Sequence, residues 1–271
     1  MATTDKRLDI SELDFDDIKT NLKTFLRNQT EFTDYDFEGS GMSSLLDLLS
    51  YNTHYLSMNA NLLANEMFID TASLRSSVVS HAKTLGYTPR SVRAPQATVD
   101  ITLNDTSVTT ATLARGTKFS TVVNDVTYNF LVNTARTKSR VDNVLTFDNV
   151  VLYEGSLITT RYTADSTNVD QRFIIPDSNA DTTTLTVSVQ NSSTDTTTTV
   201  FTLATDISQV SDTSNSYFLQ EIENGQFEVY FGDGVIGKAL TDNNIVILEY
   251  IVTNKSASNG ASTFTPPGSI S

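Results

Sequence analysis

Apolar residues follow a helical spacing in the first third of the chain and a strand-like alternation in the rest. Before about residue 93 they recur every three or four positions, which is typical of amphipathic helices. After that point, Thr-rich runs alternate polar and apolar residues between Gly, Asn and Asp, which is typical of strands with one solvated face. The pattern predicts an α+β chain with an N-terminal helical region followed by two mainly antiparallel β-modules.

The first two predicted helices begin at residues that can cap a helix. One helix spans about residues 14 to 28, and Asp14 can accept hydrogen bonds from the amides of its first turn. A second helix covers Met42 to Met67, with Ser43 or Ser44 as its N-cap.

An apolar stripe with two asparagines runs along the second helix. Two interpretations of this stripe are open: it packs within the chain, on the other helices or the β-modules, or it faces a partner. Three short helices make a small core, so association would stabilise them. Inside a monomer, Asn52 and Asn59 would also need hydrogen-bond partners. The candidate interface consists of Leu45, Leu48, Leu49, Asn52, Tyr55, Leu56, Asn59, Leu62 and Leu63.

A third helix is expected from Thr71 to Leu85, with Asp70 as its cap and Gly86 after its last turn. Pro89 and Pro95 then exclude further helix, because proline lacks the amide that the helix needs. The residues predicted to face inward are Leu74, Val78, Ala82 and Leu85.

Two hairpins can be predicted in the β-rich part. Asn224-Gly225 separates the runs Tyr217 to Glu223 and Gln226 to Phe231, and this dipeptide favours a tight hairpin turn. The Thr-rich stretch Asn179 to Thr199 retains alternating apolar residues, so we expect an exposed hairpin with a polar tip.

These observations divide the chain into four parts. The expected parts are a helical assembly region at 1–93, β-modules at 94–166 and 167–255, and a linker or the start of a further C-terminal part at 256–271.

Composition excludes several kinds of site. The chain has no Cys, which excludes a disulfide framework, a Cys-based metal centre and a catalytic thiol. His54 and His81 do not form a metal-binding pattern. We therefore expect no metal and no cofactor.

Net charge bears on the partners. Eighteen basic residues against 32 acidic ones give a formal charge of −14, and no Lys or Arg lies between Arg172 and Lys238. Such a surface repels nucleic acid and anionic lipid. The N-terminus lacks a signal-peptide pattern, and no apolar run is long enough for a membrane helix, so we expect synthesis in a cytoplasm.

The segment Gly232-Asp-Gly-Val-Ile-Gly237 matches the dinucleotide-binding pattern of spaced glycines. In a nucleotide site a helix follows and its N-terminus holds the phosphates, whereas here the turn-like Asp242-Asn-Asn244 leads into a β run. We therefore interpret the segment as a Gly-rich turn. No catalytic motif accompanies it, so we predict no catalytic residues, no small-molecule substrate and no enzymatic activity.

Several motifs together resemble the baseplate wedge proteins of T4-like contractile-tailed phages, within the wider baseplate J-like family. They are Leu85-Gly-Tyr-Thr-Pro-Arg90, Ala94 to Leu103, Leu113-Ala-Arg-Gly-Thr-Lys-Phe119, Val150-Val-Leu-Tyr-Glu-Gly155 and Phe227 to Gly237. The motifs cover about residues 40 to 262, and this part of the chain resembles the N-terminal portion of these longer proteins. The motif positions with a structural role are Gly86, Tyr87, Pro89, Gly116, Thr117, Phe119, Tyr153, Glu154, Gly155, Phe231, Gly232, Asp233, Gly234 and Gly237.

This resemblance implies a non-catalytic virion protein of the tail baseplate, assembled in the host cytoplasm. It implies pairing with a second copy and with other wedge proteins through helices. It also implies dimers that link wedges into a ring around the hub and rearrange when the tail contracts. The alternatives are a non-enzymatic β-rich adhesion or other tail assembly module and, behind it, a hydrolase with a carboxylate pair.

Overall fold

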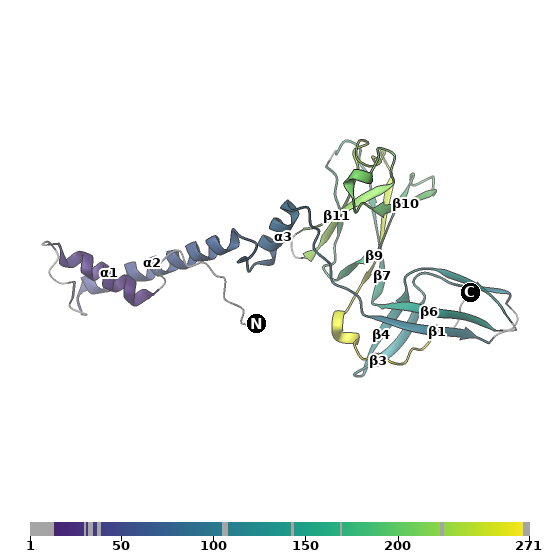
Figure 1. Ribbon diagram of the computed structural model, residues 1–271, viewed down its shortest axis with the longest axis horizontal. Coiled ribbons are helices and arrows are strands. Elements are labelled where there is room, and N and C mark those ends of the chain that lie inside the picture. The colour runs from purple at the N-terminus through teal and green to yellow at the C-terminus, as the bar shows by residue number, and fades with distance from the viewer. Residues whose placement is uncertain are drawn as a thin grey trace. The chain divides into compact units, whose positions relative to one another are not determined.

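The computed structural model describes residues 14–29, 31, 35–36, 39–104, 108–141, 144–168, 170–222 and 225–267. The chain divides into a helical unit, Met1–Tyr87, and a β unit, Thr88–Ser271. Figure 1 shows helices in the first unit and strands in the second. The predicted α+β class is confirmed.

Helix α1 (Phe15–Arg27) and helix α2 (Gly41–Glu66) begin at short polar side chains. The Asp14 carboxylate accepts hydrogen bonds from the amides of Asp16 and Asp17, at 2.8 and 3.2 Å, which confirms the predicted cap. Helix α2 starts earlier than expected. Its cap is Ser40, whose hydroxyl oxygen accepts from the Ser43 amide at 3.0 Å.

Helix α3 (Arg75–Thr84) begins four residues after the expected start at Thr71. The Asp70 cap is also wrong, because the residue at the N-cap position is Leu74, whose side chain makes no capping hydrogen bond. The Glu66 carboxylate accepts from the amides of Ser73 and Leu74, just before the helix, at 2.9 and 3.2 Å. The predicted inward face holds only at Ala82, which is buried together with Val79. The side chains of Leu74, Val78 and Leu85 are exposed.

The first sheet has the order β1-β6-β4-β3, and all its neighbours are antiparallel. Its strands are β1 (Gln96–Leu103), β3 (Lys118–Val123), β4 (Val126–Val132) and β6 (Leu145–Glu154). The short strands β2 (Thr110–Leu113) and β5 (Arg136–Ser139) pair with each other. Alternate residues face one buried cluster that includes Leu113, Phe119, Phe130, Phe147 and Leu152.

The second sheet has the order β7-β13-β9-β10-β11-β12-β8, with a parallel pair only between β10 and β11. Its strands are β7 (Ser156–Thr163), β8 (Phe173–Ile175), β9 (Ala180–Gln190), β10 (Thr198–Leu203), β11 (Ser216–Glu221), β12 (Phe227–Phe231) and β13 (Ile245–Val252). Its core includes Phe173, Val187, Val229, Leu248 and Tyr250.

Both predicted hairpins form pairs of antiparallel strands. β11 pairs with β12, while Asn224 of the expected turn lies outside the described residues. β9 pairs with β10, but the expectation of an exposed hairpin is wrong for β9. This strand lies between β10 and β13 and buries Val187 and Val189, because its long-range pairing with β13 places it in the interior of the sheet.

Two segments lie differently from the parts expected by sequence. β7 precedes the expected boundary at residue 166 yet pairs along its whole length with β13, in the second sheet. The expected linker at 256–271 begins with a short 3₁₀ helix, Lys255–Ser258, and then lies against the first sheet. There Thr265 exchanges backbone hydrogen bonds with Ser120, and the Phe264 ring packs 5.0 Å from that of Phe130. This segment lies against the first sheet because the apolar Phe264 side chain packs on the core of that sheet.

Candidate assembly interface

Helix α2 buries mostly polar residues. Its five buried residues include only one apolar side chain, that of Leu46. Helix α1 packs on α2 through Ile18, and Lys19 forms an ion pair with Asp47 at 2.5 Å. The other buried residues of α2 are Ser43, Ser50, Asn61 and Asn65.

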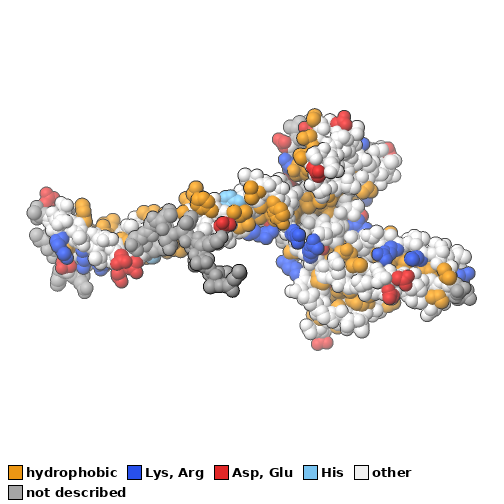
Figure 2. All heavy atoms as spheres, in the orientation of Figure 1, with side chains coloured by type: hydrophobic (Ala, Val, Ile, Leu, Met, Phe, Trp, Pro, Cys, Tyr) orange, Lys and Arg blue, Asp and Glu red, His pale blue; other side chains and the backbone are white. Residues whose placement is uncertain are grey.

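The predicted interface residues lie on the outside of α2. All seven apolar members are between 49% and 69% exposed, and Asn52 and Asn59 are exposed as well. Figure 2 shows hydrophobic side chains gathered on the surface of the helical unit. Packing within the described part of the chain therefore does not cover this stripe, and the interpretation that it faces a partner gains support.

Further exposed apolar residues widen the stripe. Tyr51 lies against Tyr55, with ring centroids 5.0 Å apart, and both rings are at least half exposed. Their hydrogen bond raises the pKa of Tyr51. The sequence signal was present, since Tyr51 and Met58 are two helical turns apart beside the predicted stripe. The additional exposed residues are Tyr51, Met58, Met67, Phe68 and Ile69.

An exposed stripe of this composition suits helix association. Leucine side chains in a helical repeat provide apolar area, and polar residues within the stripe fix the register. Exposed apolar patches of this size on soluble proteins mark interaction sites. The arrangement offers binding through burial of apolar side chains.

The motif residues Glu154 and Gly155 join the two sheets. The Glu154 side chain is fully buried, and its carboxylate accepts hydrogen bonds from the Thr253 hydroxyl at 2.7 Å and from the Asn254 amide at 2.9 Å. The Asn254 side-chain amide donates a third bond at 2.7 Å. Gly155 has φ +134°, and a Cβ there would lie 2.2 Å from the carbonyl oxygen of Val252. Only glycine fits this close approach.

Arg115 forms a second tie between the sheets, and sequence analysis did not single it out. Its guanidinium donates to the carbonyl oxygen of Thr184 at 2.7 Å and to the hydroxyl of Thr186. It also donates to the carbonyl oxygen of Glu249 at 3.4 Å and lies 3.5 Å from the Glu249 carboxylate. Burial lowers the pKa of Arg115, and the Glu249 charge opposes that shift. The sequence signal for Arg115 was its position within the motif Leu113 to Phe119, beside Gly116.

The remaining motif residues lie at turns and in cores. Gly86, with φ +73°, ends α3, and exposed Tyr87 and half-buried Pro89 follow it. Gly116 and Thr117 form the turn before β3, where Phe119 is buried. Tyr153 is half-buried in β6. Phe231, Gly232, Asp233, Gly234 and Gly237 lie at the end of β12 and in the loop after it.

The Gly-rich loop has no nucleotide-binding geometry. Residues 238–244, between Gly237 and β13, contain no helix, so no helix N-terminus faces the glycines. Across the described residues, no group of three or more His, Asp or Glu side chains could hold a metal ion. No helix in this described part is long and apolar enough to cross a membrane.

Comparisons with known proteins agree with this picture. Residues 14–87 match the family model described as baseplate wedge protein gp6-like, helical domain. The chain is 33% identical over 266 residues to baseplate wedge protein gp6 of Enterobacteria phage T4, a match that covers 91% of this chain and 39% of that protein. The chain thus spans about two fifths of the length of the curated relative it matches. The resemblance found in the sequence is confirmed, because both comparisons match this chain to baseplate wedge proteins of T4-like bacteriophages.

Proposed function

We propose that this chain is a structural subunit of a baseplate wedge in a contractile phage tail and assembles through the exposed stripe of α2. The exposed apolar face of α2 carries the proposal, because a soluble chain gains stability by covering it. The occupants are a second copy of the chain and other wedge proteins. This role involves no catalysis, cofactor, small-molecule substrate, nucleic acid or membrane.

The finer role follows from such pairing. Dimers formed through α2 link neighbouring wedges into a ring around the hub, and the ring rearranges when the tail contracts. The hydrogen bonds of Glu154 and Arg115 between the two sheets suit a β unit that keeps its structure during this rearrangement. A β-rich adhesion or other tail assembly module is the alternative, and it would not require the α2 stripe.

Self-association of the chain tests this proposal. The double variant Leu48→Asp and Leu56→Asp places two charges on side chains that are 63% and 60% exposed, so the free chain should still fold. Burying two unpaired carboxylates in an interface is strongly unfavourable. We expect sedimentation velocity to show a dimer for the unchanged chain and at least a tenfold weaker dimer for the variant.

The matched control is Val122→Asp, which changes a side chain that is 64% exposed in β3. This control should sediment like the unchanged chain. In phage particles, antibody labelling should place the unchanged chain at the tail end distal to the head and show little of the α2 double variant there. A monomer at all concentrations would reject self-association through α2, and equal loss of both variants from the phage particles would reject assembly through α2.

A further inference from the structure

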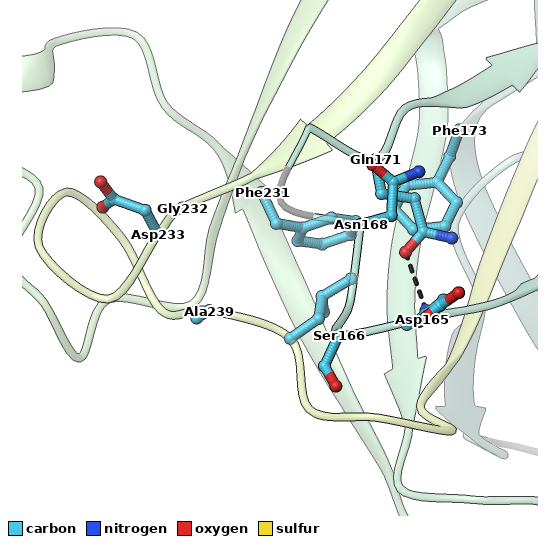
Figure 3. Close-up of a pocket in the computed structure, with 11 residues that line it drawn as sticks. Asp165, Ser166, Asn168, Gln171, Phe173, Phe231, Gly232, Asp233 and Ala239 are labelled. Atoms are coloured by element: carbon cyan, nitrogen blue, oxygen red, sulfur yellow. Dashed lines mark hydrogen bonds between the residues drawn. The ribbon is translucent and has the colours of Figure 1, made fainter.

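A groove lies beside the Gly-rich loop of the β unit, away from the α2 stripe in sequence. It consists of two adjoining hollows of about 270 and 290 Å³. Both are lined by Gln171, Phe231, Gly232 and Asp233, so the two hollows adjoin at these residues. Figure 3 shows the Phe231 and Phe173 rings beside Gln171, with Asp233 on the loop.

One side of the groove is a fixed loop. The Asp233 carboxylate accepts hydrogen bonds from the amides of Val235 and Ile236 at 2.9 and 3.0 Å. A Cβ at Gly232 would lie 2.2 Å from the carbonyl oxygen of Ile236, so the loop closes tightly on itself. The Gly237 amide donates to the carbonyl of Ser211 at 3.0 Å. The loop thus holds two apolar side chains in solvent, Val235 at 73% and Ile236 at 42% exposure.

The other side carries an aromatic pair under an arginine. The rings of Phe218 and Tyr230 stack with centroids 5.1 Å apart and planes at 19°. The Arg172 guanidinium lies 4.2 Å from the centroid of the Tyr230 ring, and Ile207 is exposed in the same hollow. Tyrosine and arginine are enriched among the residues that dominate binding at protein interfaces. Side chains already stacked also lose little entropy on binding.

The charges around the groove are almost all negative. Asp165, Asp170 and Asp233 line it, and Arg172 is the one basic residue among those lining the two hollows. Hydrogen bonds from Thr167 lower the pKa of Asp165, and the amides of the loop lower that of Asp233. A complementary partner is therefore basic where it meets the rim.

The lining groups do not suit a small polar ligand. The Gln171 side chain accepts from the Asp165 amide at 2.9 Å and donates to the Thr163 carbonyl at 3.2 Å. Asp165 and Asp233 are likewise used within their own loops. A second copy is also disfavoured, because its own groove carries the same negative rim and would repel this one.

We propose that this groove is a docking surface for a segment of another protein that presents an apolar side chain flanked by lysine or arginine. The apolar side chain enters between Ile236 and the Phe218–Tyr230 stack. The flanking cations face Asp170 and Asp165. This surface is independent of the α2 stripe, so one can fail while the other stands.

Synthetic peptides test the proposal on the full chain. One fluorescent peptide alternates isoleucine with lysine, and a second replaces every lysine with glutamate. Fluorescence anisotropy in 0.15 M salt should show at least tenfold tighter binding of the lysine peptide. Ile236→Asp should weaken that binding at least tenfold, because a carboxylate replaces the apolar contact, and Asp170→Lys should weaken it severalfold.

Ile158→Asp is the matched control, because Ile158 is 39% exposed and receives the same charge change on edge strand β7. It should leave binding within twofold of the unchanged chain. Ile207→Asp serves as a second groove variant if Ile236→Asp lowers the melting temperature. Equal binding of both peptides, or equal weakening by Ile158→Asp and the groove variants, would overturn the proposal by showing nonspecific attraction.

Discussion

The two units of this chain differ in how they place their large apolar side chains. In the β unit, strands bury many of them, such as Leu248, Tyr250 and Phe130. In the helical unit, α2 buries Ser50 and Asn61 and exposes most of its leucines. The difference fits the proposal that the helical unit covers its apolar face by association, whereas the β unit has apolar cores of its own.

The sharpest test of this comparison replaces one leucine in each unit. Leu248 is fully buried in β13, so Leu248→Ala should lower the free energy of unfolding of the β unit by about 2–5 kcal/mol. Leu48 is 63% exposed in α2. Leu48→Ala in the dilute, monomeric chain should therefore change the free energy of unfolding of the helical unit by less than about 0.5 kcal/mol. Hydrogen exchange measured by mass spectrometry resolves each unit separately.

The same experiment at high protein concentration extends the comparison. Once the chain self-associates, Leu48→Ala should reduce protection of α2, while the effect of Leu248→Ala should not change with concentration. If Leu48→Ala cost as much as Leu248→Ala in the monomer, the stripe would be packed within the chain and the contrast between the units would be wrong.

The joint between the sheets gives the second prediction. Glu154→Ala removes the acceptor of three hydrogen bonds, and Thr253 is itself buried and would lose its partner. An unpaired buried donor costs about 1–3 kcal/mol, whereas Asn254 is exposed and can bind water. We therefore expect the free energy of unfolding of the β unit to fall by about 2 kcal/mol.

The matched variant at this joint is Glu154→Gln, which keeps one acceptor oxygen and the volume of the side chain. It should cost less than Glu154→Ala and should restore most of the hydrogen-exchange protection around β6 and the end of β13. Equal losses from both variants would show that packing, rather than the acceptor, holds the joint.

The features that could be predicted from the sequence are those that depend on residues close together in the chain. The Asp14 cap, the stripe of α2 and the alternation in β1 rest on neighbours within a few residues, and pattern analysis found them. The start of α3 differs from the prediction because Glu66, at the end of α2, binds the amides of the residues just before α3. β7 was grouped with the first module because its pairing with β13 spans a long stretch of chain.

The α2 stripe shows a second limit. Helical periodicity identifies an apolar face but does not say what covers it, so both interpretations were open until the exposure of Leu48 and its neighbours was known. Glu154 lies in one of the sequence motifs, but its partners Thr253 and Asn254 are about a hundred residues away and carry no local signal.

A second glutamate, in the helical unit, gives the prediction of smallest effect. Unlike the fully buried Glu154, Glu66 is only half-buried. Hydrogen bonds from the Ser77 and Ser73 hydroxyls, with smaller contributions from the backbone amides there, lower its pKa from 4.5 to about 2. A lowered carboxyl pKa means that its stabilisation is complete above about pH 4.5 and is lost as the pH falls toward 2.

Proton–nitrogen NMR spectra of the Ser73 and Leu74 amides check this directly, because both donate to the Glu66 carboxylate. Their chemical shifts should titrate with a midpoint near pH 2 in the unchanged chain. Glu66→Gln should abolish that titration and make the start of α3 insensitive to pH over the same range. A midpoint near the ordinary value of 4.5 would show that the carboxylate is solvated rather than bound. In that case the helical unit would lack this link between the end of α2 and the start of α3.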